Sequence, residues 1–175
     1  QFSMFYAGAQ KNLGPSGVTL AVIRDDMLGK INDGLPAMID YRTHIEKKSL
    51  FNTPPSFAIY IVKLILEWID GQGGLKAVED NNIKKKDVIY KIIDANANYF
   101  RAPVRIDSRS WMNIVFRLSS DELEQKFISE ANIKGLVGLK GHRSVGGIRI
   151  SLYNAMTMEG ALKVADFMEN FRRNN

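Results

Sequence analysis

The sequence predicts an α/β protein, because segments with strand and helix periodicity alternate along its 175 residues. A β-branched run at 17–24 and an alternating apolar run at 111–118 have the pattern of strands. Two segments, 75–96 and 157–172, repeat apolar residues at helical spacing, with charged residues between them. Strands and helices that follow one another in this way are typical of a sheet covered by helices.

Glycines at 71, 73 and 74 interrupt the chain and predict a boundary between regions 1–73 and 74–175. The second region is expected to be a small α+β domain with helices on one face of a mostly antiparallel sheet. The first region contains too few elements to bury its own apolar surface. We therefore expect it to be the remnant of a larger domain that needs a partner.

In the first region we expect a helix at 57–69, and the residues just before it predict how this helix begins. Pro54 and Pro55 favour an extended entry, and Ser56 is a candidate N-cap. The helix itself is apolar on nearly all sides, which predicts burial on most faces. The elements expected in order are a strand at 17–24, a short helix or turn at 27–35, a short strand at 39–41 and the helix at 57–69.

In the second region, hydroxyl residues indicate where two helices begin. Ser119 or Ser120 is expected to cap a helix that extends to Asn132, and Thr157 the last helix. The elements expected in order are a helix at 75–96, an extended segment at 99–105, strands at 111–118 and 147–153 with a helix, a turn and a short strand (133–139) between them, and a final helix at 157–172.

Composition excludes several classes of protein. The chain has no cysteine and only two histidines, which argues against a disulfide framework and against a thiolate or histidine-rich metal site. No apolar run approaches the length of about 20 residues that a membrane span needs. We therefore expect a cytoplasmic protein without a metal site or a membrane partner.

The formal net charge of +5 does not indicate a nucleic-acid partner. The lysine clusters at 47–48 and 84–86 are short, and no aromatic residues lie between them as stacking platforms. We expect these lysines on solvated helix ends and no nucleic-acid binding.

The segment Tyr6–Gly17 places one lysine, Lys11, among alanines and glycines. A lysine in such surroundings can lose hydration, lower its pKa and form a Schiff base with an aldehyde cofactor. A surface lysine in a glycine-rich turn has the same local sequence. The residues alone leave both interpretations open.

Two further groups of residues have the chemistry of anion binding. The amide of Asn52 and the hydroxyl of Thr53 stand before a helix N-terminus, where they suit a phosphate, although the residues alone favour simple helix capping. His142, Arg143 and Arg149 flank a pair of glycines, so the loop can fold back and present two guanidinium groups to one small dianion. An ordinary surface loop or a weak phosphate nest is the alternative for this group.

Three motifs resemble segments of phosphoserine aminotransferases, in the same order. They are YAGAQKNLGPSGVTLAVIR from Tyr6, FNTPPS from Phe51 and GHRSVGGIR from Gly141, the last followed by ISLYNAM. These enzymes of serine biosynthesis, which are also linked to pyridoxine biosynthesis, depend on pyridoxal phosphate and have fold type I. The resemblance implies that this chain is the C-terminal part of such a fold, comprising a remnant of the large domain and the small domain.

The resemblance also implies roles for the residues just described. Lys11 would be the catalytic lysine, which forms the Schiff base and shuttles a proton, and Gln10 would bind the cofactor. Asn52 and Thr53 would reach the cofactor phosphate of the other subunit in a homodimer, across a shared site. Arg149 would hold the substrate α-carboxylate, and His142 with Arg143 the phosphate of phosphoserine or the γ-carboxylate of glutamate.

The implied reaction is transamination between O-phosphoserine and 2-oxoglutarate, with small anionic substrates. A class V enzyme of the alanine–glyoxylate transaminase or cysteine desulfurase type is an alternative, but the pair His142–Arg143 argues for a doubly anionic substrate. A noncatalytic anion-binding or dimerisation domain is the alternative from a different class. Members of the resembled family are longer, so we expect a chain that lacks the aspartate tuning the cofactor ring and is inactive alone.

Overall fold

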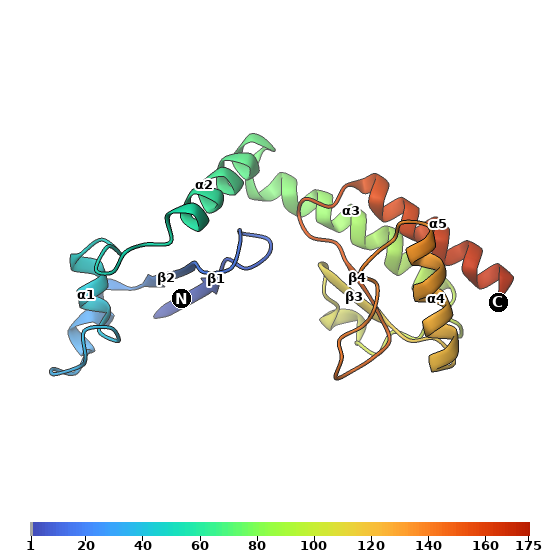
Figure 1. Cartoon of the computed structure of the whole chain (residues 1–175), viewed down its shortest axis with the longest axis horizontal. Helices are drawn as coiled ribbons and strands as arrows, with labels where there is room; N and C mark the ends of the chain where they lie inside the picture. The colour runs from blue at the N-terminus through green and yellow to red at the C-terminus, as the bar shows by residue number, and fades with distance from the viewer. Residues whose placement is uncertain (1) are drawn as a thin grey trace. The chain divides into compact units, whose positions relative to one another are not determined.

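The structure of the protein is a computed structural model, which describes residues 2–175 (Figure 1). The chain divides into two compact units, Gln1–Gly71 and Gln72–Asn175. The division falls between Gly71 and Gln72, two residues before the boundary expected from the glycines. Each unit is described by itself below. Among residues 2–175, no helix has both the length and the apolar character required to cross a membrane.

The first unit is built on a β-hairpin. Strands β1 and β2 pair antiparallel, with Met4 opposite Ile23 and Gly8 opposite Thr19. The sequence analysis did not predict β1, because its residues MFYAG lack the β-branched run that predicts β2. The elements of this unit are β1 (Met4–Gly8), β2 (Thr19–Ile23), a 3₁₀ helix (Asp25–Lys30), α1 (Tyr41–Glu46) and α2 (Ser56–Gly71).

Helix α1 replaces the short strand expected at 39–41. Asp40 is its N-cap and accepts a hydrogen bond of 2.9 Å from the backbone N–H of Arg42. The Arg42 guanidinium also pairs with the Asp40 carboxylate, and this ion pair lowers the pKa of Asp40. The local carboxylate contacts therefore favour a helix start over the weak strand preference of Ile39 and Tyr41.

Helix α2 extends from Ser56 to Gly71, but the prediction that most of its faces are buried is wrong. Within the first unit only Ala58 and Val62 of this helix are buried. Large apolar side chains such as Phe57, which is 75% exposed, lie on much of its remaining surface. The apolar composition of α2 therefore exceeds what the contacts of this unit require.

The second unit places three helices beside a short antiparallel sheet (Figure 1). In the β3–β4 pair, Asn113 lies opposite Ser151 and Phe116 opposite Ile148. Isolated bridges extend this pairing. The short strand expected within 133–139 does not form, and a single bridge joins the next residue, Lys140, to Ile148. The elements are α3 (Gly74–Ala95), a 3₁₀ helix (Ile106–Ser108), β3 (Asn113–Phe116), α4 (Asp121–Ile133), β4 (Ile148–Ser151) and α5 (Met158–Asn174).

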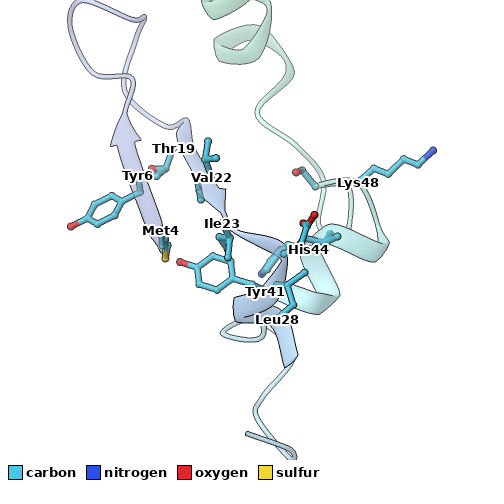
Figure 2. A pocket seen from close by; sticks show the side chains of 13 residues that line it. Met4, Tyr6, Thr19, Val22, Ile23, Leu28, Tyr41, His44 and Lys48 are labelled. Atoms are coloured by element: carbon cyan, nitrogen blue, oxygen red, sulfur yellow. The ribbon is translucent and has the colours of Figure 1, made fainter. Parts of the chain in front are cut away.

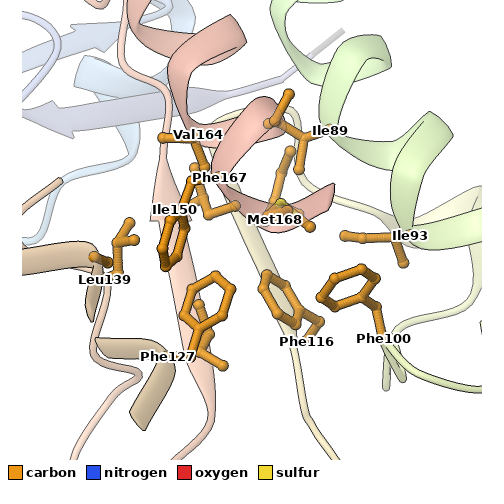
Figure 3. Close-up of a cluster of buried hydrophobic side chains, with 14 of the residues drawn as sticks. Ile89, Ile93, Phe100, Phe116, Phe127, Leu139, Ile150, Val164, Phe167 and Met168 are labelled. Carbon is orange, nitrogen blue, oxygen red and sulfur yellow. The ribbon is translucent and has the colours of Figure 1, made fainter. Parts of the chain in front are cut away.

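One hydrophobic core holds the second unit together (Figure 3). Phe127 of α4 is fully buried at its centre, with ring centroids 4.8 Å from Phe167 and 5.0 Å from Phe171 of α5. Both strands contribute alternate residues to this core. The buried residues of the strands and their edge are Ile114, Phe116, Leu118, Ile148, Ile150 and Leu152.

The alternation of the strands also decides which residues are left outside the core. Ile148 and Ile150 are buried on β4, whereas Arg149 between them is half-buried. Successive side chains of a strand point to opposite faces, so Arg149 belongs to the face away from this cluster. The two helix caps predicted in the second unit are confirmed: Ser120 accepts from the N–H of Leu123, and Thr157 accepts from that of Gly160.

Candidate active site

Lys11 lies in the loop 9–18 that connects β1 to β2. The loop is closed at its base by a hydrogen bond of 2.9 Å from the Ala9 N–H to the Val18 carbonyl. Ala9 is fully buried, whereas Gln10 and Lys11 are exposed. The small neighbours therefore do not bury Lys11 within the first unit, and of the two interpretations that the residues left open the exposed lysine is the one seen in this unit.

Gly14 fixes the other side of this loop to helix α2. A Cβ atom at position 14 would lie 2.8 Å from Cγ2 of Val62, which is too close for any side chain. Both residues are buried. The glycine is required because the loop backbone packs directly on the helix, and this packing holds the segment that carries Lys11.

Asn52 and Thr53 lie just before α2, and both are exposed. The amide nitrogen of Asn52 is 3.2 Å from the sulfur of Met38. Ser56 is not the N-cap that the sequence predicted but the first residue of α2. Its hydroxyl donates to the carbonyl oxygen of Pro54 at 3.4 Å.

The loop 141–147 is the tip of a hairpin in the second unit. The Gly141 N–H donates to the Gly147 carbonyl at 2.8 Å and closes the loop. At the tip, the N–H groups of Val145 and Gly146 both donate to the carbonyl of His142, at 2.9 and 2.8 Å. The tight turn leaves the side chains of His142 and Arg143 exposed.

The imidazole of His142 is oriented within the loop. Its Nδ1 lies 2.7 Å from the hydroxyl of Ser144 and 3.3 Å from the backbone nitrogen of the same residue. An Nδ1 that accepts the backbone hydrogen bond leaves Nε2 to act as the donor to a ligand. The loop therefore presents one N–H of His142 and the guanidinium of Arg143 at its surface.

Arg149 lies on β4, in the strand that leaves this hairpin. Its backbone nitrogen donates to the carbonyl of Leu139 at 2.8 Å, which fixes its register, and Val115 is its partner on β3. Its Nε is buried and has no hydrogen-bond partner within residues 2–175. A buried guanidinium N–H without an acceptor is costly, so this atom suits an anionic ligand.

The sequence analysis overlooked Arg117, which contacts the same loop. Its Nη1 donates to the carbonyl of Val145 at 3.1 Å, and its Nε donates to buried Glu124 at 2.6 Å. Carboxylates four and seven residues after this arginine are the only local signal of the arrangement. The contact with the loop itself joins residues 28 positions apart and has no local signature.

The predicted site residues thus fall into two groups, one in each unit. The first unit contains Gln10, Lys11, Asn52 and Thr53. One hairpin of the second unit contains His142, Arg143 and Arg149. A hollow of about 830 Å³ in the first unit lies elsewhere, between the hairpin and α1 (Figure 2). Its lining includes Tyr6, Tyr41 and His44 but none of the predicted site residues.

Comparison with known proteins identifies the family. The class-V aminotransferase family matches residues 1–164, which is most of the chain. The chain belongs to the class-V aminotransferases. It is 52% identical over 173 residues to the phosphoserine aminotransferase of Geobacillus kaustophilus, covering 99% of this chain and 48% of that relative.

Solved structures of class-V aminotransferases agree with this assignment. The phosphoserine aminotransferase of Bacillus circulans subsp. alkalophilus matches 99% of this chain with a TM-score of 0.94 and 50% identity. A phosphoserine aminotransferase of Trichomonas vaginalis with bound PLP matches 95% with a TM-score of 0.88 and 36% identity. The chain covers 48% of each of these structures and thus spans about half the length of its relatives. The predicted fold class, an α/β fold of the fold type I transferases, is confirmed.

Proposed function

We propose that the full-length protein is a phosphoserine aminotransferase that exchanges the amino group between O-phosphoserine and 2-oxoglutarate. The observation that carries the proposal is the hairpin of the second unit, which holds His142 and Arg143 at its tip and Arg149 on its strand. The buried Nε of Arg149, unpaired among the described residues, supports an anionic ligand at this hairpin. A substrate with two separated anionic groups suits this set of hydrogen-bond donors.

In this proposal Arg149 binds the α-carboxylate of the substrate. A planar guanidinium can donate two parallel hydrogen bonds to a carboxylate and so fixes its orientation. His142 and Arg143 bind the anion at the other end, which is the phosphate of phosphoserine or the γ-carboxylate of glutamate. One set of residues thereby serves both amino-acid substrates.

Pyridoxal phosphate is the cofactor in this proposal, and the donor set of the first unit fits it. The exposed amine of Lys11 suits its aldehyde, the amide of Gln10 its ring substituents, and Asn52 with Thr53 its phosphate. When bound, the cofactor supplies the electron sink that makes the substrate Cα–H acidic. The Lys11 Nζ accepts the proton that leaves Cα and returns it later in the reaction.

We further propose a cytoplasmic homodimer in which Asn52 and Thr53 serve the site of the partner subunit. The exposed apolar side chains of α2 support an interface, since an isolated soluble unit rarely leaves such a surface uncovered. The absence of cysteine from the sequence fits a reducing compartment.

The cofactor assignment is tested by chemical trapping in the full-length protein. After incubation with pyridoxal phosphate and reduction with borohydride, peptide mass spectrometry is expected to find the added mass on Lys11. The variant Lys11→Ala is expected to lose this label, and Lys63→Ala, which removes another exposed lysine of the same unit, to keep it. Labelling of Lys11→Ala at the wild-type level would exclude Lys11 as the cofactor lysine.

The substrate assignment is tested by comparing kcat/KM for O-phosphoserine with that for L-serine and L-alanine. We expect a preference for O-phosphoserine of at least about a hundredfold, because two charge-assisted hydrogen bonds to the phosphate are lost with the other substrates. Equal or better use of L-alanine would favour the alanine–glyoxylate type of class-V enzyme instead.

A further inference from the structure

We propose that Arg117 and Glu124 form a brace that positions the 141–147 loop for phosphate binding. In this arrangement Arg117 is a positioning residue, which acts through His142 and Arg143 and does not contact the substrate. The proposal rests on the function proposed above for this loop. Its physical basis is a chain of contacts from a buried carboxylate to the tip of the loop.

The first contact in this chain joins Arg117 to the loop backbone. The Arg117 Nη1 donates to the carbonyl of Val145 at 3.1 Å, two residues from Arg143. The N–H of Val145 in turn donates to the carbonyl of His142. The peptide units on both sides of Val145 are therefore fixed, one by Arg117 and one by the turn that carries His142.

The aliphatic part of Arg117 also packs under the loop. A Cβ atom at Gly147 would lie 2.6 Å from Cδ of Arg117, and one at Gly146 would lie 3.5 Å from its Nη1. The two glycines allow the loop backbone to lie along the length of the arginine side chain. The glycine pair that the sequence analysis assigned to loop folding therefore has a second role, which is to accommodate Arg117.

Two carboxylates of α4 bind the Arg117 guanidinium. The Arg117 Nε donates to Oε1 of Glu124 at 2.6 Å, and its Nη2 donates to Oδ1 of Asp121 at 2.8 Å. Only 5% of the Glu124 side chain is exposed, and the same Oε1 accepts the N–H of Leu118 at 3.1 Å. The Glu124 hydrogen bond raises the pKa of Arg117 above its ordinary value.

The backbone of Arg117 is equally constrained. Its N–H and carbonyl both bond to Arg101, each at 2.9 Å. All three guanidinium nitrogens have acceptors, and rotating the side chain would leave the buried Glu124 carboxylate without its charged partner. The loop is thus tied to the sheet and to α4.

The charges around Arg117 indicate a positioning role rather than direct anion binding. Two carboxylates, Asp121 and Glu124, surround the one guanidinium, so the cluster has a net negative charge and does not attract a phosphate. The exposed side chains of His142 and Arg143 are the proposed anion ligands on the loop. A loop that is already ordered loses less conformational entropy when it binds a ligand.

The experiment uses the full-length protein with the variants Arg117→Met, Arg117→Lys and Glu124→Gln. The control Arg173→Met removes an exposed arginine near the end of α5. Hydrogen–deuterium exchange of the peptide that covers 141–147 reports the order of the loop, and steady-state kinetics report KM and kcat for O-phosphoserine. Glu124→Gln keeps the size of the side chain. It therefore tests the brace in a second variant if Arg117→Met does not fold.

For Arg117→Met and Glu124→Gln we expect faster exchange in 141–147 and a KM for O-phosphoserine raised about tenfold, with kcat changed less than about twofold. Arg117→Lys is expected to restore part of the KM, since its stem still packs under the glycines, and Arg173→Met to behave as wild type. Unchanged exchange in both variants would overturn the brace, and so would faster exchange with an unchanged KM. A wild-type protein without activity on O-phosphoserine would refute the proposed function instead, while the exchange data would still decide whether the brace exists.

Discussion

The ammonium of Lys85 on α3 donates a hydrogen bond of 2.9 Å to the carbonyl of Tyr153, the second residue after β4. It also donates to the carbonyls of Asn154 at 3.4 Å and Met156 at 2.9 Å, although the residue is only 2% exposed. One buried lysine thus satisfies three carbonyls of the connection between β4 and α5. This cap fixes the end of the strand that carries Arg149.

Replacing Lys85 by Met is expected to lower the free energy of unfolding by about 2 kcal/mol, because it removes the buried ammonium that donates to three carbonyl groups. Chemical denaturation measures the loss. The matched control is Lys84→Met, which changes an exposed neighbour on the same helix and is expected to have little effect. Equal stability of the two variants would contradict a stabilising role for the buried ammonium.

The same lysine predicts a dependence of stability on pH. Burial lowers the pKa of Lys85 below its ordinary value of 10.5. At a pH between the lowered pKa of the folded state and the ordinary pKa of the unfolded state, Lys85 binds more protons in the unfolded chain than in the folded one. Its contribution to the free energy of unfolding therefore rises with pH. The difference in stability between wild type and Lys85→Met is therefore expected to grow from neutral towards pH 10. A difference that shrinks over this interval would have the wrong sign.

Phe127 is expected to be among the most important side chains of the core. It is fully buried and contacts the rings of Phe116, Phe167 and Phe171 edge-on or nearly so. Phe127→Ala should destabilise the second unit by about 3–5 kcal/mol, because the cavity cannot close around three other rings. The control Phe57→Ala removes a ring that is 75% exposed and should not change the unfolding of this unit.

Gly147 and Gly138 illustrate two different reasons why a position requires glycine. Both have a positive φ, 74° and 77°, but an added Cβ meets nothing within 4 Å at Gly138, whereas at Gly147 it would lie 2.9 Å from the carbonyl oxygen of Phe116. Gly138→Ala should cost about 1–2 kcal/mol from the backbone conformation alone. Gly147→Ala should cost about 1–3 kcal/mol more through overpacking. Denaturation curves of equal midpoint for the two variants would contradict this difference.

The elements that were predicted correctly depend on signals a few residues long. The run at 17–24 forms β2, and the hydroxyls of Ser120 and Thr157 begin α4 and α5 as expected. Each cap bonds to an N–H three residues later, so the information lies within one turn. Such contacts are visible in the sequence because they do not depend on the rest of the fold.

The predictions that were wrong concern segments whose structure depends on distant groups or on competing local contacts. Helix α2 was expected to be buried because apolar residues surround it, but burial depends on what packs against the helix, and within its unit little does. The strand at 39–41 was displaced by the Asp40 cap of α1. Of the site, the motifs identified the loop of Lys11 and the 141–147 loop, whereas Arg117 and Lys85 act on carbonyls 28 or more positions away.

Arg149 offers the most direct test of the proposed substrate contacts. It lies on a strand whose register is fixed on both sides, by Val115 and by the Leu139 carbonyl, so a substitution should not displace the backbone. Arg149→Lys keeps the positive charge but loses the planar donors, and the KM for O-phosphoserine and for glutamate should both rise about 10- to 100-fold. Arg143→Lys at the exposed tip should affect the two substrates unequally, because their distal anions differ. If Arg149→Lys raised the KM for only one of the two, Arg149 would bind a distal anion rather than the α-carboxylate that both substrates share.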